Sequence, residues 1–307
     1  MITVLLTRPT SQESAQLYLK HGVKIIPYNF KKRKKEGKIR AFIAAFGAMQ
    51  PNVFRFLKDT WVNPRLLKLL KGASPKTKFI MWYGDQRGKV PDIISERSKF
   101  IDMLFVNNAD PQQVKMYNKI GIPYVKPFYS NYYPTKYAKV KPTVDVIFGG
   151  NNFNPKKFPL SKFRLDTVLA INKICKMKIY GNGWPVSAAK YIASRVAYNQ
   201  ALHTAKITLG INHYNVARYY DRRLFDCLST GRMHLTHYIP GMEKDFENHK
   251  NLVWFKTIPE GVKLIKYYLN NNSKRNAIGK AGLATLLLKH SMDARIKTFV
   301  KHVSVML

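Results

Sequence analysis

The sequence predicts an α/β protein with two doubly wound parallel sheets, one in each of two domains. Three observations favour this fold class. The chain has 307 residues, 46% of them hydrophobic, which suits two cores of ordinary size. It opens with a strand, a helix and a second strand, the order typical of a parallel sheet. A second series of apolar strands follows a stretch rich in Pro and Tyr, and its first strands run into glycine turns. We therefore expect two Rossmann-like domains that face a central cleft.

The first domain is predicted to span residues 1–135. Thr10 or Ser11 precedes its first helix as a capping residue. Its predicted elements are strand 3–6, helix 11–21, strand 23–27, strand 41–46, helical pieces 53–60 and 64–71, strands 78–83 and 103–106, and helix 111–119. Residues 123–142 lack a clear hydrophobic period and are interpreted as the linker between the domains.

The second domain is predicted to span residues 136–290. Its expected strands are 144–148, 177–180, 207–210, 233–236 and 251–255. Its expected helices are 161–173, 188–203, a helix over the segment from 219 to 228, a short one near 240–248, 259–270 and 273–290, followed by an amphipathic helix at 292–303. Loops that leave the carboxyl ends of parallel strands meet on the ligand side of such a sheet. Asn212 and the turns 149–150 and 181–184 are therefore candidates for a ligand site.

The second domain is organised around residues 219–236, which predict a helix, a tight turn at Gly231 and a strand. Arg222 and Arg223 in the first turn oppose the helix dipole, which is reasonable if a phosphate binds at that end. Asp226 lies three residues after Arg223, where its carboxylate can accept hydrogen bonds from ribose hydroxyls. A surface arginine pair with an Arg–Asp salt bridge explains the same spacing equally well.

Residues 223–231, Arg-Leu-Phe-Asp-Cys-Leu-Ser-Thr-Gly, resemble the segment Arg-x-Phe-Glu-Ala-Leu-Ala-Cys-Gly of group-1 glycosyltransferases with the GT-B fold. Within that family the spore-maturation-protein-like branch is the most similar. The segments 145–150 and 179–184 resemble the family's Phe-Val-Gly and Tyr-Gly-x-Gly-Trp turns. The resemblance implies that Asp226, in place of the family's Glu, binds the ribose of a nucleotide-sugar donor. A second Glu that related retaining families carry eight residues upstream is Arg218 here.

The resemblance also implies the donor half of the site and the place of the last helix. The predicted donor-binding residues are Gly149, Gly150, Gly181, Gly183, Trp184, Asn212, Arg222, Arg223 and Asp226. The donor is expected to be a UDP-sugar, with no permanently bound cofactor and no divalent metal required by the motifs. Residues 291–307 are expected to pack back on the first domain, as the C-terminal helix of GT-B enzymes does.

The charge of the chain predicts a polyanionic partner. It has 53 Lys and Arg against 17 Asp and Glu, a formal charge of +36, which promotes binding to nucleic acid or to an anionic membrane. Seven of the ten residues in 31–40 are basic, and the predicted position of this run after a strand places it beside the cleft. The predicted acceptor-binding residues are Arg8, Lys31, Lys32, Arg33, Lys34, Lys35 and Arg87.

These observations favour a glycosyltransferase that acts on double-stranded DNA, a hypothesis that rests on charge and on fold-level analogy with bacteriophage DNA glycosyltransferases. A base hydroxyl in a duplex has to be extruded to react, and Tyr129, Tyr132 and Tyr133 are candidates for the surface that receives it. Asp85, at the end of a strand, is the candidate catalytic base, although a turn-forming Asp is nearly as good an interpretation. His213 is a weaker candidate base. The alternatives are a transferase for cell-envelope or lipid acceptors and a nucleic-acid-binding protein without activity.

Other classes of protein receive no support from the sequence. Cys175 and Cys227 are too few for a disulfide framework or a metal cluster, so a cytoplasmic location is expected, in the host if the protein is viral. There is no apolar run long enough for a transmembrane helix and no internal repeat. We expect a monomer.

Overall fold

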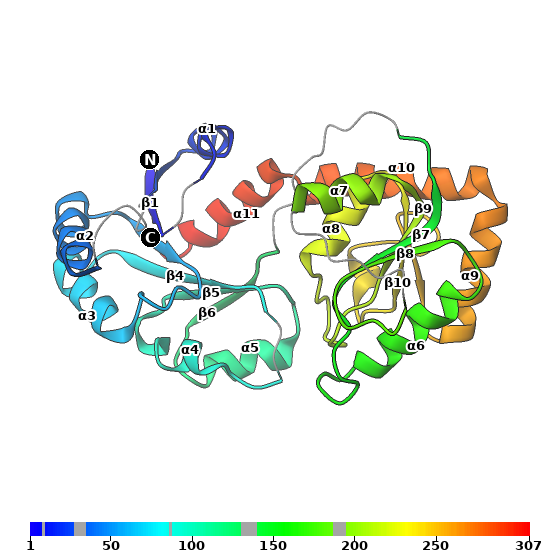
Figure 1. The fold of residues 1–307 in the computed structure, drawn as a ribbon. Helices are drawn as coiled ribbons and strands as arrows, with labels where there is room; N and C mark the ends of the chain where they lie inside the picture. Colours follow the sequence, from blue (N-terminus) through cyan, green and yellow to red (C-terminus); the bar gives the residue numbers. More distant parts are fainter. Residues whose placement is uncertain (8–9, 28–34, 86–87, 130–139, 187–194) are drawn as a thin grey trace. The chain divides into compact units, whose positions relative to one another are not determined.

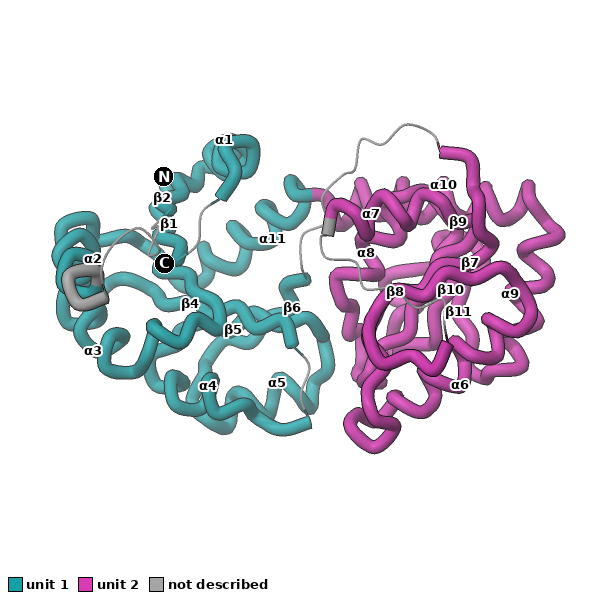
Figure 2. Tube along the Cα trace, in the orientation of Figure 1, with its two compact units in different colours: residues 1–129, 292–307 teal, residues 130–291 magenta. Residues whose placement is uncertain are grey.

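A computed structural model of the chain describes residues 1–7, 10–27, 35–85, 88–129, 140–186 and 195–307 (Figure 1). The side chains of residues 35–38 and 195 lie outside this description. The chain divides into two compact units, and each is an α/β unit with one parallel sheet (Figure 2). Unit 1 comprises Met1–Tyr129 and Met292–Leu307, and unit 2 comprises Ser130–Ser291. The predicted fold class is confirmed.

Unit 1 contains a parallel sheet with the strand order β2-β1-β3-β4-β5-β6. Its strands are β1 (Ile2–Leu6), β2 (Val23–Pro27), β3 (Val53–Phe56), β4 (Lys78–Tyr83), β5 (Met103–Val106) and β6 (Tyr124–Pro127). Its helices are α1 (Gln12–Lys20), α2 (Lys35–Met49), α3 (Pro64–Ala73), α4 (Asp92–Ser95) and α5 (Pro111–Asn118), together with α11 (Met292–Ser304). Ser11 caps α1 by accepting a hydrogen bond from the Ser14 amide.

Helix α11 is part of the core of unit 1. Its residues Ile296, Phe299 and Val303 are fully buried in one cluster with Val4 and Phe105 of the sheet. Helix α11 therefore joins unit 1 through apolar burial, the main favourable contribution to folding, although 162 residues of unit 2 precede it in the chain.

Three predictions in the first half of the chain are wrong. Residues 41–46 lie in helix α2 rather than in a strand, because Ile39, Phe42, Ile43 and Phe46 recur at the spacing of one helix face. Residues 53–56 form strand β3 rather than a helix, and their burial between β1 and β4 explains the apolar run. The predicted linker begins too early, because Tyr124–Pro127 is an edge strand, where a terminal proline is tolerated.

Unit 2 contains a parallel sheet with the strand order β11-β10-β9-β7-β8. Its strands are β7 (Val144–Gly149), β8 (Met177–Tyr180), β9 (Ala205–Gly210), β10 (Met233–His237) and β11 (Val253–Phe255). Its helices are α6 (Ser161–Asn172), α7 (Arg195–His203), α8 (Arg222–Leu228), α9 (Ile258–Asn270) and α10 (Asn272–His290). The predicted helix 188–203 is described only from Arg195, because 187–194 lie outside the described residues. The predicted short helix near 240–248 is a 3₁₀ turn at Met242–Lys244.

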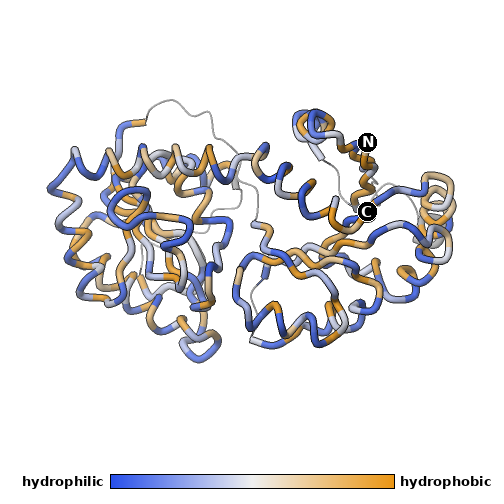
Figure 3. Tube along the Cα trace, turned by 180° about the vertical axis from the view of Figure 1, so that it is seen from behind, coloured by the Kyte–Doolittle hydropathy of each residue, from blue (hydrophilic) through white to orange (hydrophobic). Residues whose placement is uncertain are grey.

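Buried hydrophobic side chains explain the layers of unit 2. Its core joins inward-facing residues of the strands to one face of α6, α9 and α10. Figure 3 shows the strands coloured mainly as hydrophobic and long stretches of the surrounding helices as hydrophilic. This is the pattern expected of a sheet covered on both faces.

The strand order of unit 2 creates a switch point between β7 and β9. The chain passes from β7 to its neighbour β8 on one side and then to β9 on the other side. The connections that leave β7 and β9 therefore diverge at the carboxyl edge of the sheet. In open α/β sheets, ligands bind in the crevice that this divergence leaves.

Candidate functional site

The segment predicted to organise the second domain forms the short helix α8, which begins at Arg222. Asp221 is its N-cap, in extended conformation, and its carboxylate accepts hydrogen bonds from the amides of Arg223 at 3.0 Å and Leu224 at 3.4 Å. The prediction that Tyr219 and Tyr220 belong to the helix is wrong. The expectation that the helix N–H groups meet a phosphate is also wrong for these two amides, because Asp221 already occupies them.

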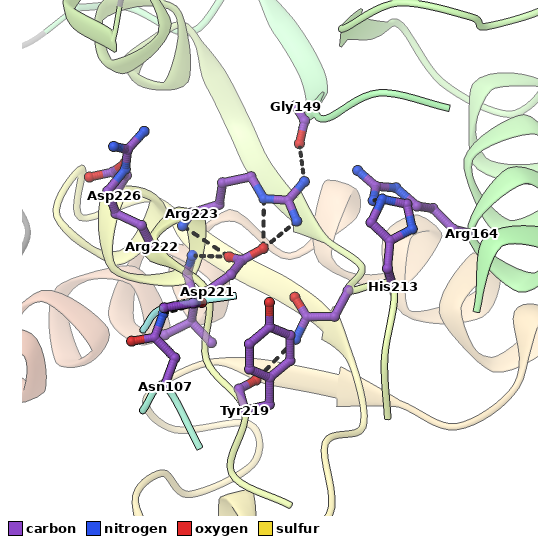
Figure 4. A network of polar contacts seen from close by, with 12 residues as sticks. Asn107, Gly149, Arg164, His213, Tyr219, Asp221, Arg222, Arg223 and Asp226 are labelled. Atoms are coloured by element: carbon purple, nitrogen blue, oxygen red, sulfur yellow. Dashed lines mark hydrogen bonds and ion pairs between the residues drawn. The ribbon is translucent and has the colours of Figure 1, made fainter. Parts of the chain in front are cut away.

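Arg223 connects α8 to the end of β7. Its Nη1 donates to the Gly149 carbonyl at 2.9 Å and its Nε donates to the Asp221 carboxylate at 2.8 Å (Figure 4). Burial raises the pKa of the Asp221 carboxyl, but the Arg223 charge and hydrogen bonds outweigh it and hold that pKa below its usual value. The ion pair is therefore formed at neutral pH, and it fixes Arg223 beside the switch point.

Arg164 of α6 is a second buried arginine at the same place. Its side chain is 1% exposed, its Nη1 donates to Nε2 of His213, and its guanidinium carbon lies 4.9 Å from the centre of the Phe148 ring. Its Nε and Nη2 have no hydrogen-bond partner among the described residues. Burial and then the charge of Arg223 lower the pKa of Arg164 well below its usual value. A buried cation with unused donors is unfavourable unless an anion joins it.

Gly150 allows the two arginines to approach each other. A Cβ at this position would overlap Arg164 Nη2 and Arg223 Nη1, and the residue has φ +152°. Both guanidinium groups therefore lie against the backbone of the turn that follows β7. Two cations that converge on a glycine turn form a local positive potential suited to a phosphate group.

His213 supports Arg164 and is poorly suited to act as a base. A guanidinium can only donate, so Nε2 of His213 is the acceptor and the ring is neutral. Burial, followed by the charge of Arg164, lowers the pKa of His213 to about 3. At neutral pH this imidazole stays unprotonated. A role in orienting Arg164 therefore fits His213 better than the role of catalytic base that the sequence suggested.

The predicted glycine turns hold each other in place. A Cβ at Gly181 would overlap the Gly150 carbonyl, whose oxygen also accepts a hydrogen bond from Trp184 Nε1 at 2.8 Å. Asn152 Nδ2 donates to the Gly183 carbonyl at 2.8 Å. Trp184 is buried at 8% exposure. Gly181, Gly183 and Trp184 therefore buttress the turn at Gly150, and their small size serves the contact between the two turns.

Asp226 and Arg222 form a pair of their own on α8. The Asp226 carboxylate is 1% exposed and accepts a hydrogen bond from Arg222 Nε at 3.2 Å, whereas the Arg222 side chain is 48% exposed. Figure 4 shows this pair directed away from the Asp221–Arg223 contacts. Asn212, the other predicted donor residue here, donates from Nδ2 to the Tyr219 carbonyl at 3.0 Å and so fixes the loop before α8.

In unit 1, Asp85 follows the carboxyl end of β4, and its carboxylate is paired with Lys58. Tyr129 is buried, with Arg295 over its ring at 5.1 Å, so its proposed role in receiving a base is wrong. Lys35 is the first residue of helix α2, whereas the sequence predicts that it lies in the basic run that directly follows a strand. The remaining predicted acceptor residues, Arg8, Lys31, Lys32, Arg33, Lys34 and Arg87, and also Tyr132 and Tyr133, lie outside the described residues.

Two residues of this site, Arg164 and Asp221, were not predicted from the sequence. Arg164 was not singled out, although it shares a helix face with Thr167, Val168 and Ile171, all fully buried. That spacing predicts a side chain that faces the sheet, and an arginine there indicates a buried charge. Asp221 was also missed, although an Asp directly before a helix is a typical N-cap.

In the part of the chain that the structure describes, no helix is both long and apolar enough to cross a membrane. No three His, Cys, Asp or Glu side chains among the described residues are grouped to hold a metal ion.

Residues 162–301, which include Arg164, His213 and α8, match a family model described as glycosyl transferase-like. This span carries a glycosyltransferase-like domain. The match confirms the enzyme class predicted from the sequence. No curated protein is similar enough in sequence to count as a match.

Solved structures with the same fold cover the whole chain. HepE of Anabaena, solved in complex with UDP-glucose, has a TM-score of 0.62 and 10% identity over 99% of this chain and 100% of its own. Sucrose-phosphate synthase of Thermosynechococcus elongatus has a TM-score of 0.63 and 8% identity over 100% and 99%. A glycosyltransferase of Rickettsia africae has a TM-score of 0.64 and 10% identity over 99% and 98%. At such low identities these structures establish the fold, which is GT-B.

Proposed function

We propose that the protein transfers a sugar from a nucleotide-sugar, and that Arg164 and Arg223 bind the donor diphosphate. The observation that carries the proposal is the pair of guanidinium groups against Gly150, one of them buried with two nitrogens unpaired. An anionic group is the ligand that would satisfy both the charge and the unused donors. The switch point of a doubly wound sheet is where such ligands bind.

The same arrangement suits the chemistry of transfer. When the sugar leaves, negative charge accumulates on the departing diphosphate, and fixed cationic donors stabilise that charge. Arg223 is held by Asp221 and Gly149, and Arg164 is held by His213. Both are therefore preorganised, so little rearrangement is needed as the charge develops.

We propose a UDP-sugar as the donor, in line with the UDP-glucose bound by HepE. Asp226 is the proposed ribose ligand. Because Arg222 is paired with this carboxylate, the ribose has to replace that contact, and the half-exposed Arg222 side chain can turn toward solvent. The proposed donor requires no further cofactor from the protein, and no divalent metal enters the proposal.

The proposed acceptor is a hydroxyl on a modified base of double-stranded DNA. The formal charge of +36 supports it, and so does the basic run 31–40. Asp85 is the proposed base for the acceptor hydroxyl, which requires Lys58 to release its carboxylate. We propose a cytoplasmic monomer. Transfer to a cell-envelope or lipid acceptor is the second candidate, since an anionic membrane also attracts a basic surface.

The test is to incubate the protein with a panel of UDP-sugars and either hydroxymethylated or unmodified duplex DNA, followed by mass spectrometry of the nucleosides. We expect a hexose or pentose adduct on the hydroxymethylated base alone. The Arg164→Met variant serves as the control for a contaminating enzyme, because it should form little adduct. Binding of UDP without any DNA adduct, together with sugar transfer to anionic lipid, would contradict the DNA acceptor but retain the donor site.

A further inference from the structure

Unit 2 contains a second groove, apart from the site at Gly150. It has a volume of about 800 Å³ and lies between helices α9 and α10 and the loop before β11. Its floor is apolar and includes Leu264 and Ile278, and its walls carry tyrosines and lysines. Volumes of this size are typical of small-molecule sites.

The groove extends from Glu260 in the first turn of α9 to the edge of the sheet opposite the arginine pair. Lys250 precedes β11 and therefore lies at the amino end of that strand. Helix α9 leaves the carboxyl end of β11 and runs back, which brings its last turns, with Tyr267, to the amino end. Gly150 follows the carboxyl end of β7. A ligand in the groove is therefore distinct from the donor proposed above.

Tyr267 offers a flat aromatic surface in this groove. It is 42% exposed, whereas the other Phe, Tyr and Trp side chains described in this unit are buried or half-buried. Its ring stands edge-on to Tyr268 at 5.0 Å between centres, and Tyr268 is in turn held by a hydrogen bond of 2.7 Å to His249 Nδ1. The exposed ring is thus held in one orientation by its neighbours, which lowers the entropic cost of stacking a ligand against it.

Three lysines surround the aromatic surface. The Lys274 ammonium donates to the Tyr267 hydroxyl at 2.8 Å, and Lys263 has no acidic partner within 4.0 Å among the described residues. Lys250 is paired with Glu247 at 2.8 Å, and Glu260 is the acidic residue of the lining. The balance remains positive, so the groove favours an anion that also carries an apolar, planar part.

We propose that this groove binds a nucleotide unit, with the base against Tyr267 and the apolar floor and the phosphate at Lys263 and Lys274. Stacking on tyrosine combined with lysine–phosphate contacts is the general chemistry of sequence-independent recognition of single strands. A free nucleotide and a strand of nucleic acid share this chemistry. The inference does not depend on the reaction proposed for the donor site.

The experiment uses the full chain and a single-stranded oligonucleotide of about eight nucleotides that contains photoreactive 5-iodouracil. After irradiation, the cross-linked peptide is identified by mass spectrometry, and affinity is measured by fluorescence anisotropy. We expect a cross-link to Tyr267, and a loss of affinity of about 5- to 150-fold for Tyr267→Ala. Lys263→Ala combined with Lys274→Ala should reduce the slope of log affinity against log salt by about 1.4.

The control is the double variant Lys176→Ala, Lys178→Ala, which removes the same charge from two exposed positions, one directly before β8 and one within it. It should leave the cross-link in place. If both double variants weaken binding equally and no cross-link reaches Tyr267, binding is diffuse charge attraction and the proposal fails. It also fails if the groove variants lose binding to phosphatidylglycerol vesicles but retain the oligonucleotide.

Competition by UMP distinguishes the two sources of the ligand. Complete displacement of the cross-link at low UMP concentration identifies a free nucleotide, and resistance to UMP identifies a strand; both support the proposed chemistry. Unfolding and UDP binding at the donor site are measured for Tyr267→Ala in parallel. Both should match the wild type, because Tyr267 is exposed and lies at the other edge of the sheet. If Tyr267→Ala is less stable and loses oligonucleotide binding in proportion to that loss of stability, Tyr267 is a structural residue and the proposal fails.

Discussion

Replacement of Arg164 by Met should separate donor affinity from stability. Methionine keeps an unbranched side chain of similar reach but removes the charge and all donors. In the wild type, Nε and Nη2 are buried without a hydrogen-bond partner among the described residues, and the proposed phosphate supplies one. A hydrogen bond to a charged group contributes about 1.5–3 kcal/mol, so the loss of one such bond should weaken UDP binding by roughly 10- to 150-fold.

Stability should respond differently to the same change. Burial lowers the pKa of Arg164, which means that the folded state holds this cation at a cost in free energy. Its removal relieves that cost, whereas His213 Nε2 loses its donor, at a penalty of about 1–3 kcal/mol. Because the two effects oppose each other, we expect the free energy of unfolding to stay within about 1 kcal/mol of the wild-type value or to rise.

Calorimetric titration with UDP and denaturant unfolding measure the two quantities. Arg232→Met is the matched control. Arg232 directly precedes β10 and donates to the carbonyls of Val140 and His203, so its hydrogen bonds lie away from the turn at Gly150. It should retain UDP binding. An Arg164→Met variant that binds UDP as tightly as the wild type would refute the role of the arginine pair, and a large loss of stability would make Arg164 a structural residue.

Four further predictions concern Asp221, Asp226, Asp85 and His234, a buried residue of β10. The carboxyl pKa of Asp221 is lowered in the folded state, so its stabilisation is present above its unfolded pKa of about 3.9 and is lost as pH falls below it; the stability difference between wild type and Asp221→Asn in denaturant unfolding should therefore shrink below about pH 4. Burial lowers the pKa of His234 to about 4, so the protein should lose stability as pH falls from 6.5 toward that value, and His234→Gln should reduce the slope of unfolding free energy by roughly 1.4 kcal/mol per pH unit near pH 5. Asp226→Asn should weaken UDP binding by about 1.5–3 kcal/mol, whereas Arg222→Ala, which removes the ion pair with Asp226, should not weaken it. Calorimetry that shows the reverse order would remove Asp226 from the ribose site. Asp85→Asn should leave UDP binding unchanged and lower turnover on the modified DNA by roughly 10²-fold or more, and near-normal turnover would place the base elsewhere.

The sequence predicted most strands because they are buried on both faces and read as short apolar runs. The strands at 78–83, 103–106 and 177–180 have the predicted bounds. The same property misled the assignment of residues 41–46, since a helix with Phe42 and Phe46 on its buried face also contains an apolar run of that length. Short apolar runs do not distinguish the two states without the contacts that bury them.

The candidate site was predicted only in part, because hydrogen bonds between residues far apart in the sequence position its other side chains. The glycine turns and Arg223 belong to local sequence patterns and were predicted from them. The contact of Arg223 with the Gly149 carbonyl spans 74 residues, and that of Arg164 with His213 spans 49. No local spacing encodes such partners. The Asp221 cap is local, and an Asp directly before a helix is the pattern that predicts it.

Helix α11 has a consequence for the order in which the chain folds during synthesis. Domains generally fold as units as the chain emerges, and unit 2 is complete once residue 291 has been made. Unit 1 begins first, yet Ile296, Phe299 and Val303 of its core are added only afterwards. Until then, the apolar surface around Val4 and Phe105 stays open to water and to other chains. The nascent first unit should therefore depend on chaperones for longer than the second, and a ribosome stalled before residue 292 should leave it aggregation-prone beside a folded unit 2.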